Sequence, residues 1–124
     1  MIFGIGTDIA KVSRFEKCVN TPEMIARFFN QKEFRAFTSK KAACEHYAAR
    51  FAAKEAFGKA LGTGIFGFEL ADVYIVNTES GKPEFMVEGK AAEILKNKCG
   101  NSKIHVSLSH EKEFAVAFVI IEQI

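Results

Sequence analysis

The sequence predicts one α+β domain of residues 1–124, with helices packed on a mainly antiparallel sheet. Two patterns carry this prediction: short apolar stretches that come in pairs joined by turn residues, and one long helical stretch from roughly Lys40 to Leu61. The predicted order of elements is β-α-α-ββ-α-ββ. Because no linker, repeat or low-complexity segment interrupts the 124 residues, we expect a single folding unit.

The first third of the chain combines a strand with short helices. Ile2–Ile9 alternates apolar and small residues and predicts a strand, and Val12–Val19 predicts a short helix or a loop. Thr21 followed by Pro22 is typical of a helix start, since threonine caps the first turn and proline fits within it. The helices of this region are expected to bury Ile25, Phe28 and Phe29 and, in a second short helix from near Asn30, to carry Phe34 and Phe37.

The long helix has clear signals at both ends. Thr38 and Ser39 can cap its start, and Gly62 can take the left-handed conformation that ends a helix. The remaining elements are expected to be the strands Val73–Val76 and Glu84–Val87, a helix over Gly89–Lys98, and the strands Ile104–Ser109 and Phe114–Glu122. The strict alternation of Ile104–Ser109 predicts one apolar face and one polar face.

The composition predicts a core filled by phenyl rings, because the chain has 13 Phe and no Trp. A net charge of +2 gives no indication of a nucleic-acid partner. The charge is uneven, however: residues 11–41 hold eight Lys or Arg against three Glu. This basic segment is either a solvated face or a surface that steers an acidic partner.

The cysteines and the hydropathy pattern predict a soluble cytoplasmic protein. Cys18, Cys44 and Cys99 are odd in number and lack metal-site spacing, which favours reduced thiols. The N-terminus lacks the basic lead and apolar stretch of a signal peptide. The longest apolar run, Phe114–Ile121, is too short to span a membrane as a helix.

Two acidic residues are candidate ligands for a divalent cation. Asp8 follows Gly6-Thr7 in the first strand, and Glu55 lies in mid-helix among Ala and Phe. Together they could hold Mg²⁺, which takes one or two carboxylates and fills its other positions with water and phosphate oxygens. The alternatives remain open: Asp8 could be a turn residue, and Glu55 could form an i,i+4 pair with Lys59, worth about 0.2–0.5 kcal/mol.

The charges of the long helix lie on two of its sides. At about 100° per residue, Arg50 and Lys54 lie on one side, while Glu55 and Lys59 lie on another. This pattern indicates a helix whose polar groups face a pocket or partner as well as water. The three basic residues could bind phosphate through their side chains.

Three further motifs have simpler alternatives. Gly62-Thr63-Gly64 follows a helix, so it is neither a Walker loop nor a dinucleotide fingerprint. Turn chemistry is sufficient for Ser80-Gly81-Lys82-Pro83, with a position at a pocket rim as the alternative. Ser109 and His110 do not form a nucleophile–base pair, because neighbouring strand residues point to opposite faces. This argues against a hydrolase triad, and His110 is either a structural hydrogen-bonding residue or a functional one.

Taken together, these motifs resemble one family, the small holo-acyl-carrier-protein synthases among the 4′-phosphopantetheinyl transferases. The matching segments span nearly the whole chain: GIGTDI at 4–9 with Arg14 downstream, RFAAKEAFGKALGTG at 50–64, GKP at 81–83, HVSLSH at 105–110 and the closing AVAFVIIE. The second segment together with the others is highly specific.

The resemblance implies transfer of phosphopantetheine from coenzyme A to a serine of apo-acyl carrier protein, releasing adenosine 3′,5′-bisphosphate, in fatty acid biosynthesis. It implies Mg²⁺ at Asp8 and Glu55, and Arg14 as a contact to the acidic carrier protein. Our own hypothesis is that the serine proton leaves through a metal-associated water or directly to Asp8 or Glu55. The resemblance also implies a homotrimer with coenzyme A between subunits. The cofactor-binding residues that it implies are Arg50, Lys54, Lys59, Gly62, Gly81, Lys82, Pro83, Ser109 and His110.

The chain departs from the family pattern in two places. Glu111 stands after the Ser-His pair where the family often has Thr, and Ala10-Lys11 stands where an apolar pair and an acid are commoner. Neither change touches the expected metal ligands. Two rival functions remain: a non-catalytic basic module that docks an acidic protein, and another Mg²⁺-dependent phosphotransfer enzyme that acts on free nucleotides.

Overall fold

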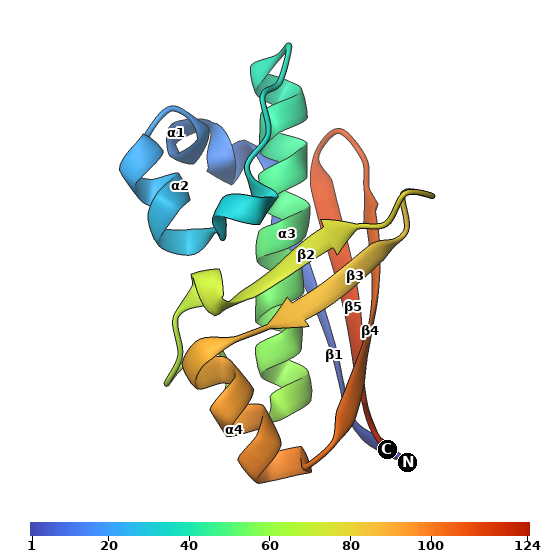
Figure 1. Cartoon of the computed structure of the whole chain (residues 1–124). Helices are drawn as coiled ribbons and strands as arrows, with labels where there is room; N and C mark the ends of the chain where they lie inside the picture. Colours follow the sequence, from blue (N-terminus) through green and yellow to red (C-terminus); the bar gives the residue numbers. More distant parts are fainter.

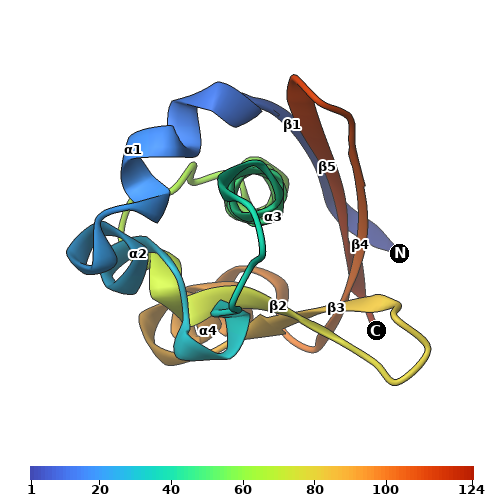
Figure 2. The ribbon, with the colours of Figure 1, turned by 90° about the horizontal axis from the view of Figure 1, so that it is seen from above.

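The computed structural model describes all 124 residues and confirms the α+β prediction. Helix α3 (Lys40–Leu61) runs through the middle of the molecule, and the other elements surround it (Figures 1 and 2). The strands are β1 (Ile2–Lys11), β2 (Val73–Asn77), β3 (Pro83–Val87), β4 (Ser102–His110) and β5 (Phe114–Gln123). They form two antiparallel sheets, a three-stranded one in the order β1-β5-β4 and the β2-β3 hairpin, where the sequence had suggested one.

The smaller helices cover the sides of α3 that the large sheet leaves free (Figure 2). They are α1 (Glu16–Val19), α2 (Pro22–Phe28) and α4 (Gly89–Cys99), with 3₁₀ turns at Val12–Phe15, Gln31–Glu33 and Leu70–Asp72. The second short helix expected from near Asn30 is only the turn Gln31–Glu33, and both Phe34 and Phe37 lie beyond it. It stops there because the Glu33 side chain points inward and the backbone of Phe34 is extended.

Helix α3 ends as its sequence predicted. The Oγ atom of Ser39 accepts a hydrogen bond of 3.1 Å from the backbone N–H of Ala42, which caps the N-terminus. Gly62 ends the helix in the left-handed conformation, with φ of 88°.

The long helix approaches β1 very closely, because small residues face each other there. A β-carbon on Gly4 would overlap the carbonyl oxygen of Ala60, and one on Gly6 would overlap that of Ala56. Both alanines are almost fully buried. The glycines of the GIG motif therefore allow the backbones to touch, and this contact fixes the position of the next inward-facing residue of β1, Asp8.

The two faces of the three-stranded sheet have different surroundings. The inner face packs on α3 through the buried residues Ala10, Ala115, Ala117, Val119 and Ile121. The outer face exposes large apolar side chains in a single copy of the chain: Ile5 and Ile9 are both 60% exposed, and Phe118 is 40% exposed. The register pairs Ile9 with Val116 and Thr7 with Phe118, so these side chains form one continuous patch.

The core agrees with the composition. Phe15, Phe29, Phe57 and Phe85 are all buried, and several phenyl rings meet edge to face. The three cysteines are buried and unpaired, as the sequence predicted. None of the helices is both long and apolar enough to cross a bilayer.

Candidate active site

Asp8 and Lys59 meet where β1 passes the second half of α3. The Nζ atom of Lys59 lies 3.1 Å from Oδ1 of Asp8 and donates a second hydrogen bond of 2.9 Å to the backbone oxygen of Thr7. The Asp8 side chain is 20% exposed, so solvent or a ligand can reach it. The sequence could not bring these residues together by spacing, since 51 positions separate them.

Glu55 belongs to the same group. Its carboxyl pKa is raised, first by burial and then by the negative charge of Asp8, while Lys59 and Arg14 lower it. Two neighbouring carboxylates, one of them with a raised pKa, form an oxygen-rich site that attracts a divalent cation. No cluster of three or more His, Cys, Asp or Glu side chains occurs in the chain, so such a cation would take its remaining ligands from water or a substrate.

Arg14 lies at the edge of this group, in the 3₁₀ turn that follows β1. Its side chain is exposed, and its positive charge acts on Glu55. Arg14 is therefore the member of the basic segment (residues 11–41) whose charge acts on the acidic group. This position is compatible with a contact to an acidic partner, which stays a prediction.

Arg50 belongs to a second group, on the side of α3 that faces β2. Its Nη2 atom donates a hydrogen bond of 3.0 Å to Oδ1 of Asn77, the last residue of β2. Asn77 in turn donates from Nδ2 to the backbone oxygen of Gly81, at 3.0 Å. Arg50 is therefore tied to the GKP turn that the sequence had marked as a candidate pocket rim.

That turn borders a groove between the two sheets. The groove has a volume of about 540 Å³ and runs between β3 and β4. Its lining residues are Lys82, Pro83, Glu84, Phe85, Lys103, Ile104, His105 and Val106. Two predicted cofactor-binding residues, Lys82 and Pro83, thus line a cavity of the size that small-molecule ligands occupy.

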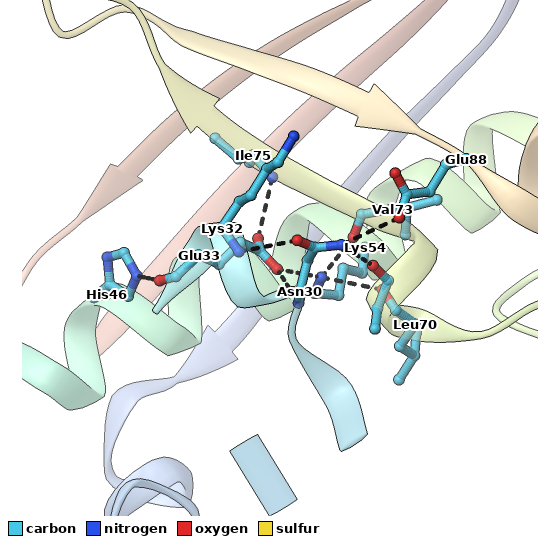
Figure 3. Close-up of polar contacts among 10 residues, drawn as sticks. Asn30, Lys32, Glu33, His46, Lys54, Leu70, Val73, Ile75 and Glu88 are labelled. Atoms are coloured by element: carbon cyan, nitrogen blue, oxygen red, sulfur yellow. Dashed lines mark hydrogen bonds and ion pairs between the residues drawn. The ribbon is translucent and has the colours of Figure 1, made fainter. Parts of the chain in front are cut away.

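Lys54 is not available to a cofactor, so that prediction is wrong for this structure. Its side chain is 1% exposed, and its ammonium forms a 2.7 Å ion pair with Glu33 (Figure 3). It also donates to the backbone oxygens of Leu70 and Val73, which uses all three of its N–H bonds. The helical spacing placed Lys54 beside Arg50 correctly, but a buried acid from another segment takes its charge.

Glu33 completes this network from the acidic side. Its carboxylate accepts hydrogen bonds from Lys54, from the backbone N–H of Ile75 at 3.1 Å and from the backbone N–H of Asn30 at 3.1 Å. The backbone oxygen of Glu33 accepts a hydrogen bond of 2.7 Å from Nε2 of His46 (Figure 3). The contacts to Ile75 on β2 and to His46 and Lys54 on α3 join three segments through Glu33, so the network fixes β2 against α3.

His110 and Ser109 point to opposite faces of the sheet, as their adjacent positions in a strand predicted. The Nδ1 atom of His110 lies 2.9 Å from Oε2 of Glu45 on α3, so His110 faces the helix. Ser109 pairs in register with Val116 on the exposed outer face. Glu45 therefore orients His110, a role that the sequence analysis did not assign.

The predicted site residues thus form two groups in one copy of the chain. Asp8 lies on one edge strand of the large sheet and His110 on the other, with β5 between them. Two strand spacings separate the edges by about 10 Å. Gly62 ends α3, and a β-carbon there would meet no atom within 4 Å.

Sequence reasoning missed four polar residues of these groups: Glu33, Arg35, Glu45 and Asn77. Only Glu33 had a local signal, because Asn30 and Glu33 have the spacing of a capping box, which the structure contains. The other three act through contacts between distant segments, for which short-range patterns give no sign.

Comparisons with known proteins agree with this geometry. Residues 4–119 match the 4′-phosphopantetheinyl transferase superfamily. The chain is 50% identical, over 98% of its length and 99% of the relative's, to the holo-[acyl-carrier-protein] synthase of Treponema denticola. The holo-[acyl-carrier-protein] synthase of Neisseria meningitidis has a similar structure, with a TM-score of 0.85 and 34% identity over 98% of this chain and 99% of that one. The Bacillus anthracis enzyme, solved with coenzyme A (3′,5′-ADP), has a TM-score of 0.79 and 34% identity over 100% and 99% of the two chains.

The fold and these matches define an enzyme of the transferase class. The chain belongs to the 4′-phosphopantetheinyl transferase superfamily, in the group of its holo-acyl-carrier-protein synthase relatives, as the sequence motifs predicted.

The buried imidazole of His46 predicts a loss of stability in mild acid. Burial, followed by the charge of Arg50, lowers its pKa from 6.5 to about 4, although its hydrogen bond to Glu33 acts in the opposite direction. Since the unfolded chain binds this proton first, the contribution of His46 is complete above pH of about 6.5 and is lost as pH falls toward 4. From about pH 7 to about pH 5 we expect the free energy of unfolding to fall by about 2 kcal/mol through His46 alone.

Urea denaturation at the two pH values measures this change. The variant His46→Gln, which keeps a donor for the Glu33 carbonyl but does not titrate, should show a pH dependence smaller by about 2 kcal/mol. Equal pH dependence in the two proteins would contradict the assignment.

Proposed function

We propose that the protein transfers the 4′-phosphopantetheine group from coenzyme A to a serine of an apo-acyl carrier protein, with release of adenosine 3′,5′-bisphosphate. The observation that carries this proposal is the meeting of Asp8, Glu55 and Lys59, two acids and a cation, beside a basic surface. The names of the relatives and the coenzyme bound in the Bacillus anthracis enzyme support the choice of substrates. We assign the reaction to fatty acid biosynthesis in the cytoplasm.

The donor set of Asp8 and Glu55 fits a magnesium ion. Carboxylate oxygens are the hard ligands that Mg²⁺ prefers, and a site with only two of them leaves positions for water and for substrate phosphates. When bound, the ion would supply positive charge to the pyrophosphate of coenzyme A. The raised proton affinity of Glu55 supports the fit, because a nearby cation relieves the repulsion that causes it.

Asp8, Glu55 and Lys59 would then have separate roles in the transfer reaction. The serine oxygen forms a bond to the β-phosphorus, and the bond from that phosphorus to the bridging oxygen breaks, so that adenosine 3′,5′-bisphosphate leaves. Lys59, fixed by the Thr7 carbonyl, places positive charge beside the phosphates. Asp8 or Glu55 accepts the serine proton, directly or through a water molecule.

The second group would hold the rest of the coenzyme. Arg50 supplies charge from the hairpin side, and Gly81, Lys82 and Pro83 border the groove that would take the nucleotide. His110, oriented by Glu45, would hold the coenzyme or order the reacting water. Ser109 on the outer face and Gly62 at the end of α3 complete the proposed contacts.

We further propose that the active enzyme is a homotrimer whose coenzyme sites lie between subunits. One coenzyme could reach both residue groups if a neighbouring copy of the chain placed its Arg50 and GKP turn beside the Asp8, Glu55 and Lys59 of this copy. The apolar patch on the outer sheet face supports this assembly, because such a patch is usually covered by a partner. The number of copies comes from the resemblance to the family.

The acidic carrier protein would dock on the basic segment of residues 11–41, with Arg14 as a direct contact. Arg14 is exposed and close enough to Glu55 to affect it, so a partner held there would bring its serine toward Asp8 and Glu55. A non-catalytic basic module that only docks an acidic protein is the alternative, and the following experiment separates the two.

The first prediction concerns the reaction itself. Purified protein incubated with Mg²⁺, coenzyme A and apo-acyl carrier protein should increase the mass of the carrier by one phosphopantetheine group, measured by mass spectrometry. The variant Glu55→Gln should lower the rate at least about a hundredfold, because it removes one charged ligand and one candidate base. A chelator should stop transfer by the wild-type protein, and added Mg²⁺ should restore it.

The matched control is Glu93→Gln on α4, where the glutamate is exposed and forms only a long contact of 3.8 Å to Lys90. It should transfer at the wild-type rate. No gain of carrier mass with any divalent cation would leave the binding module as the better function.

The second prediction concerns the carrier surface. The variant Arg14→Glu should lower kcat/KM for the carrier protein by about tenfold and reduce its dependence on salt, since it reverses a steering charge. The KM for coenzyme A should stay the same. Lys98→Glu on α4, an exposed charge outside the basic segment, is the control, and equal effects of the two reversals would refute a role for Arg14.

The third prediction concerns the assembly. The variant Phe118→Glu should shift the sedimenting mass from trimer to monomer and lower transfer, because a charge on the outer face opposes burial. Met86→Glu on β3 is the control, since Met86 is 39% exposed, close to the 40% of Phe118, but lies on the other sheet. A trimer that survives Phe118→Glu with full activity would place the interface elsewhere.

A further inference from the structure

A strap of residues 34–39 leads from the 3₁₀ turn at Gln31–Glu33 to the start of α3 (Figure 1). Its backbone is extended at both ends, with φ of −70° and ψ of 137° at Phe34 and φ of −140° and ψ of 150° at Ser39. No backbone N–H or C=O group of residues 35–38 takes part in a backbone–backbone hydrogen bond. The strap is therefore held in place by its side chains.

Two of these side chains attach the strap to α3 and β2. The Nη2 atom of Arg35 donates a hydrogen bond of 2.9 Å to Oδ1 of Asn77, the last residue of β2. The ring of Phe37 packs against the rings of His46 and Tyr47 on α3, with centroid distances of 5.0 and 6.1 Å. A groove remains between the strap, the first half of α3 and the pair of short helices α1 and α2.

This groove has an apolar lining and a volume of about 540 Å³, which is within the range of small-molecule sites. Its apolar lining residues come from all four segments: Val19, Ile25, Phe34, Phe37, Ala43 and Tyr47. Ile25, Ala43 and Tyr47 are buried, whereas Phe34 is 41% exposed. Part of the apolar wall therefore faces water, and an apolar chain in the groove would remove it from water.

The charged residues of the groove are both positive. Arg35 and Lys40 line it, and no Asp or Glu does. Arg35 is bonded to Asn77, whereas the Lys40 side chain is exposed and its ammonium has no ion pair within the chain. An apolar wall beside an unpaired cation suits a molecule that has an apolar chain and one anionic group.

We propose that this groove binds a single-chain amphipathic anion, a fatty carboxylate, with its chain along the apolar wall and its carboxylate at Lys40. The apolar wall disfavours a small, strongly hydrated anion, and one ammonium matches one carboxylate. The groove is separate from the candidate active site. Along the axis of α3, Lys40 lies about 22 Å from Glu55, so the ligand leaves the acidic group accessible.

Two simpler situations give different results. A groove that holds only water predicts no binding of a carboxylate. Adsorption of the carboxylate to the exposed outer face of the large sheet predicts binding that grows with chain length but does not depend on Lys40. The proposal requires both dependences, on the chain and on this lysine.

The test is titration calorimetry of the full-length protein with octanoate, decanoate and dodecanoate, each below the concentration at which micelles form. One molecule should bind per chain, and Kd should fall about twofold to fourfold for each added methylene group, because each one buries further apolar surface. Decanol, which has no charge, should bind about fivefold more weakly than decanoate.

Three variants locate the ligand. Lys40→Glu should weaken decanoate binding about tenfold and leave decanol binding unchanged, since it reverses the charge without altering the wall. Lys41→Glu is the matched control, because Lys41 is also exposed in the first turn of α3 but does not line the groove, and it should leave both affinities unchanged. Ala43→Phe should abolish binding of all three carboxylates, because the new ring occupies the groove.

A wild-type protein that binds none of the carboxylates, or binds them with equal Kd, would overturn the proposal. Equal effects of Lys40→Glu and Lys41→Glu would do the same, as would full decanoate affinity in Ala43→Phe. Circular dichroism reports whether each variant is folded. If Ala43→Phe does not fold, the comparison of Lys40→Glu with Lys41→Glu decides alone, since surface substitutions have little effect on stability.

Discussion

The buried ion pair between Glu33 and Lys54 is the contact on which the hairpin side of the molecule depends. Two charges removed from water are costly unless other polar groups also satisfy them. Here the carboxylate accepts backbone N–H groups of Asn30 and Ile75, and the ammonium donates to two backbone carbonyls. Removing either partner would leave the other charged and buried, so the pair fixes β2, the 3₁₀ turn at Gln31–Glu33 and α3 in one arrangement.

A second constraint, which needs no charge, fixes the opposite side of α3. Gly4 and Gly6 let β1 touch the helix at Ala60 and Ala56, and larger residues would force the backbones apart. Asp8 continues the same inward-facing series along β1 and so reaches Lys59. The first constraint therefore positions the arginine side of the site, and the second positions its acidic side.

The sequence predicted the parts of the site that depend on local pattern. Helical spacing separated Arg50 from Glu55 correctly, and strand alternation placed Ser109 and His110 on opposite faces. It failed at Lys54, because its partner Glu33 lies 21 positions away and shares no periodicity with it. The sequence pattern also did not predict the contact between Arg35 and Asn77, because it spans 42 positions and joins a strand end to a segment without regular structure. The family resemblance supplied the acidic pair, which spacing alone could not bring together.

The charge pattern of α3 follows from these two constraints taken together. A helix that packs against both a sheet and a hairpin has no fully solvated side, so its charges must pair inside the molecule or face a ligand. Lys54 pairs with Glu33, whereas Glu55 and Lys59 face Asp8, and Arg50 keeps a donor without a partner. The two unsatisfied sides point away from each other, so under the proposed function one extended substrate would satisfy both by lying between copies of the chain. In that proposal a single copy would hold only half of each site, which is a physical reason to expect the proposed assembly, as the exposed face of the sheet also is.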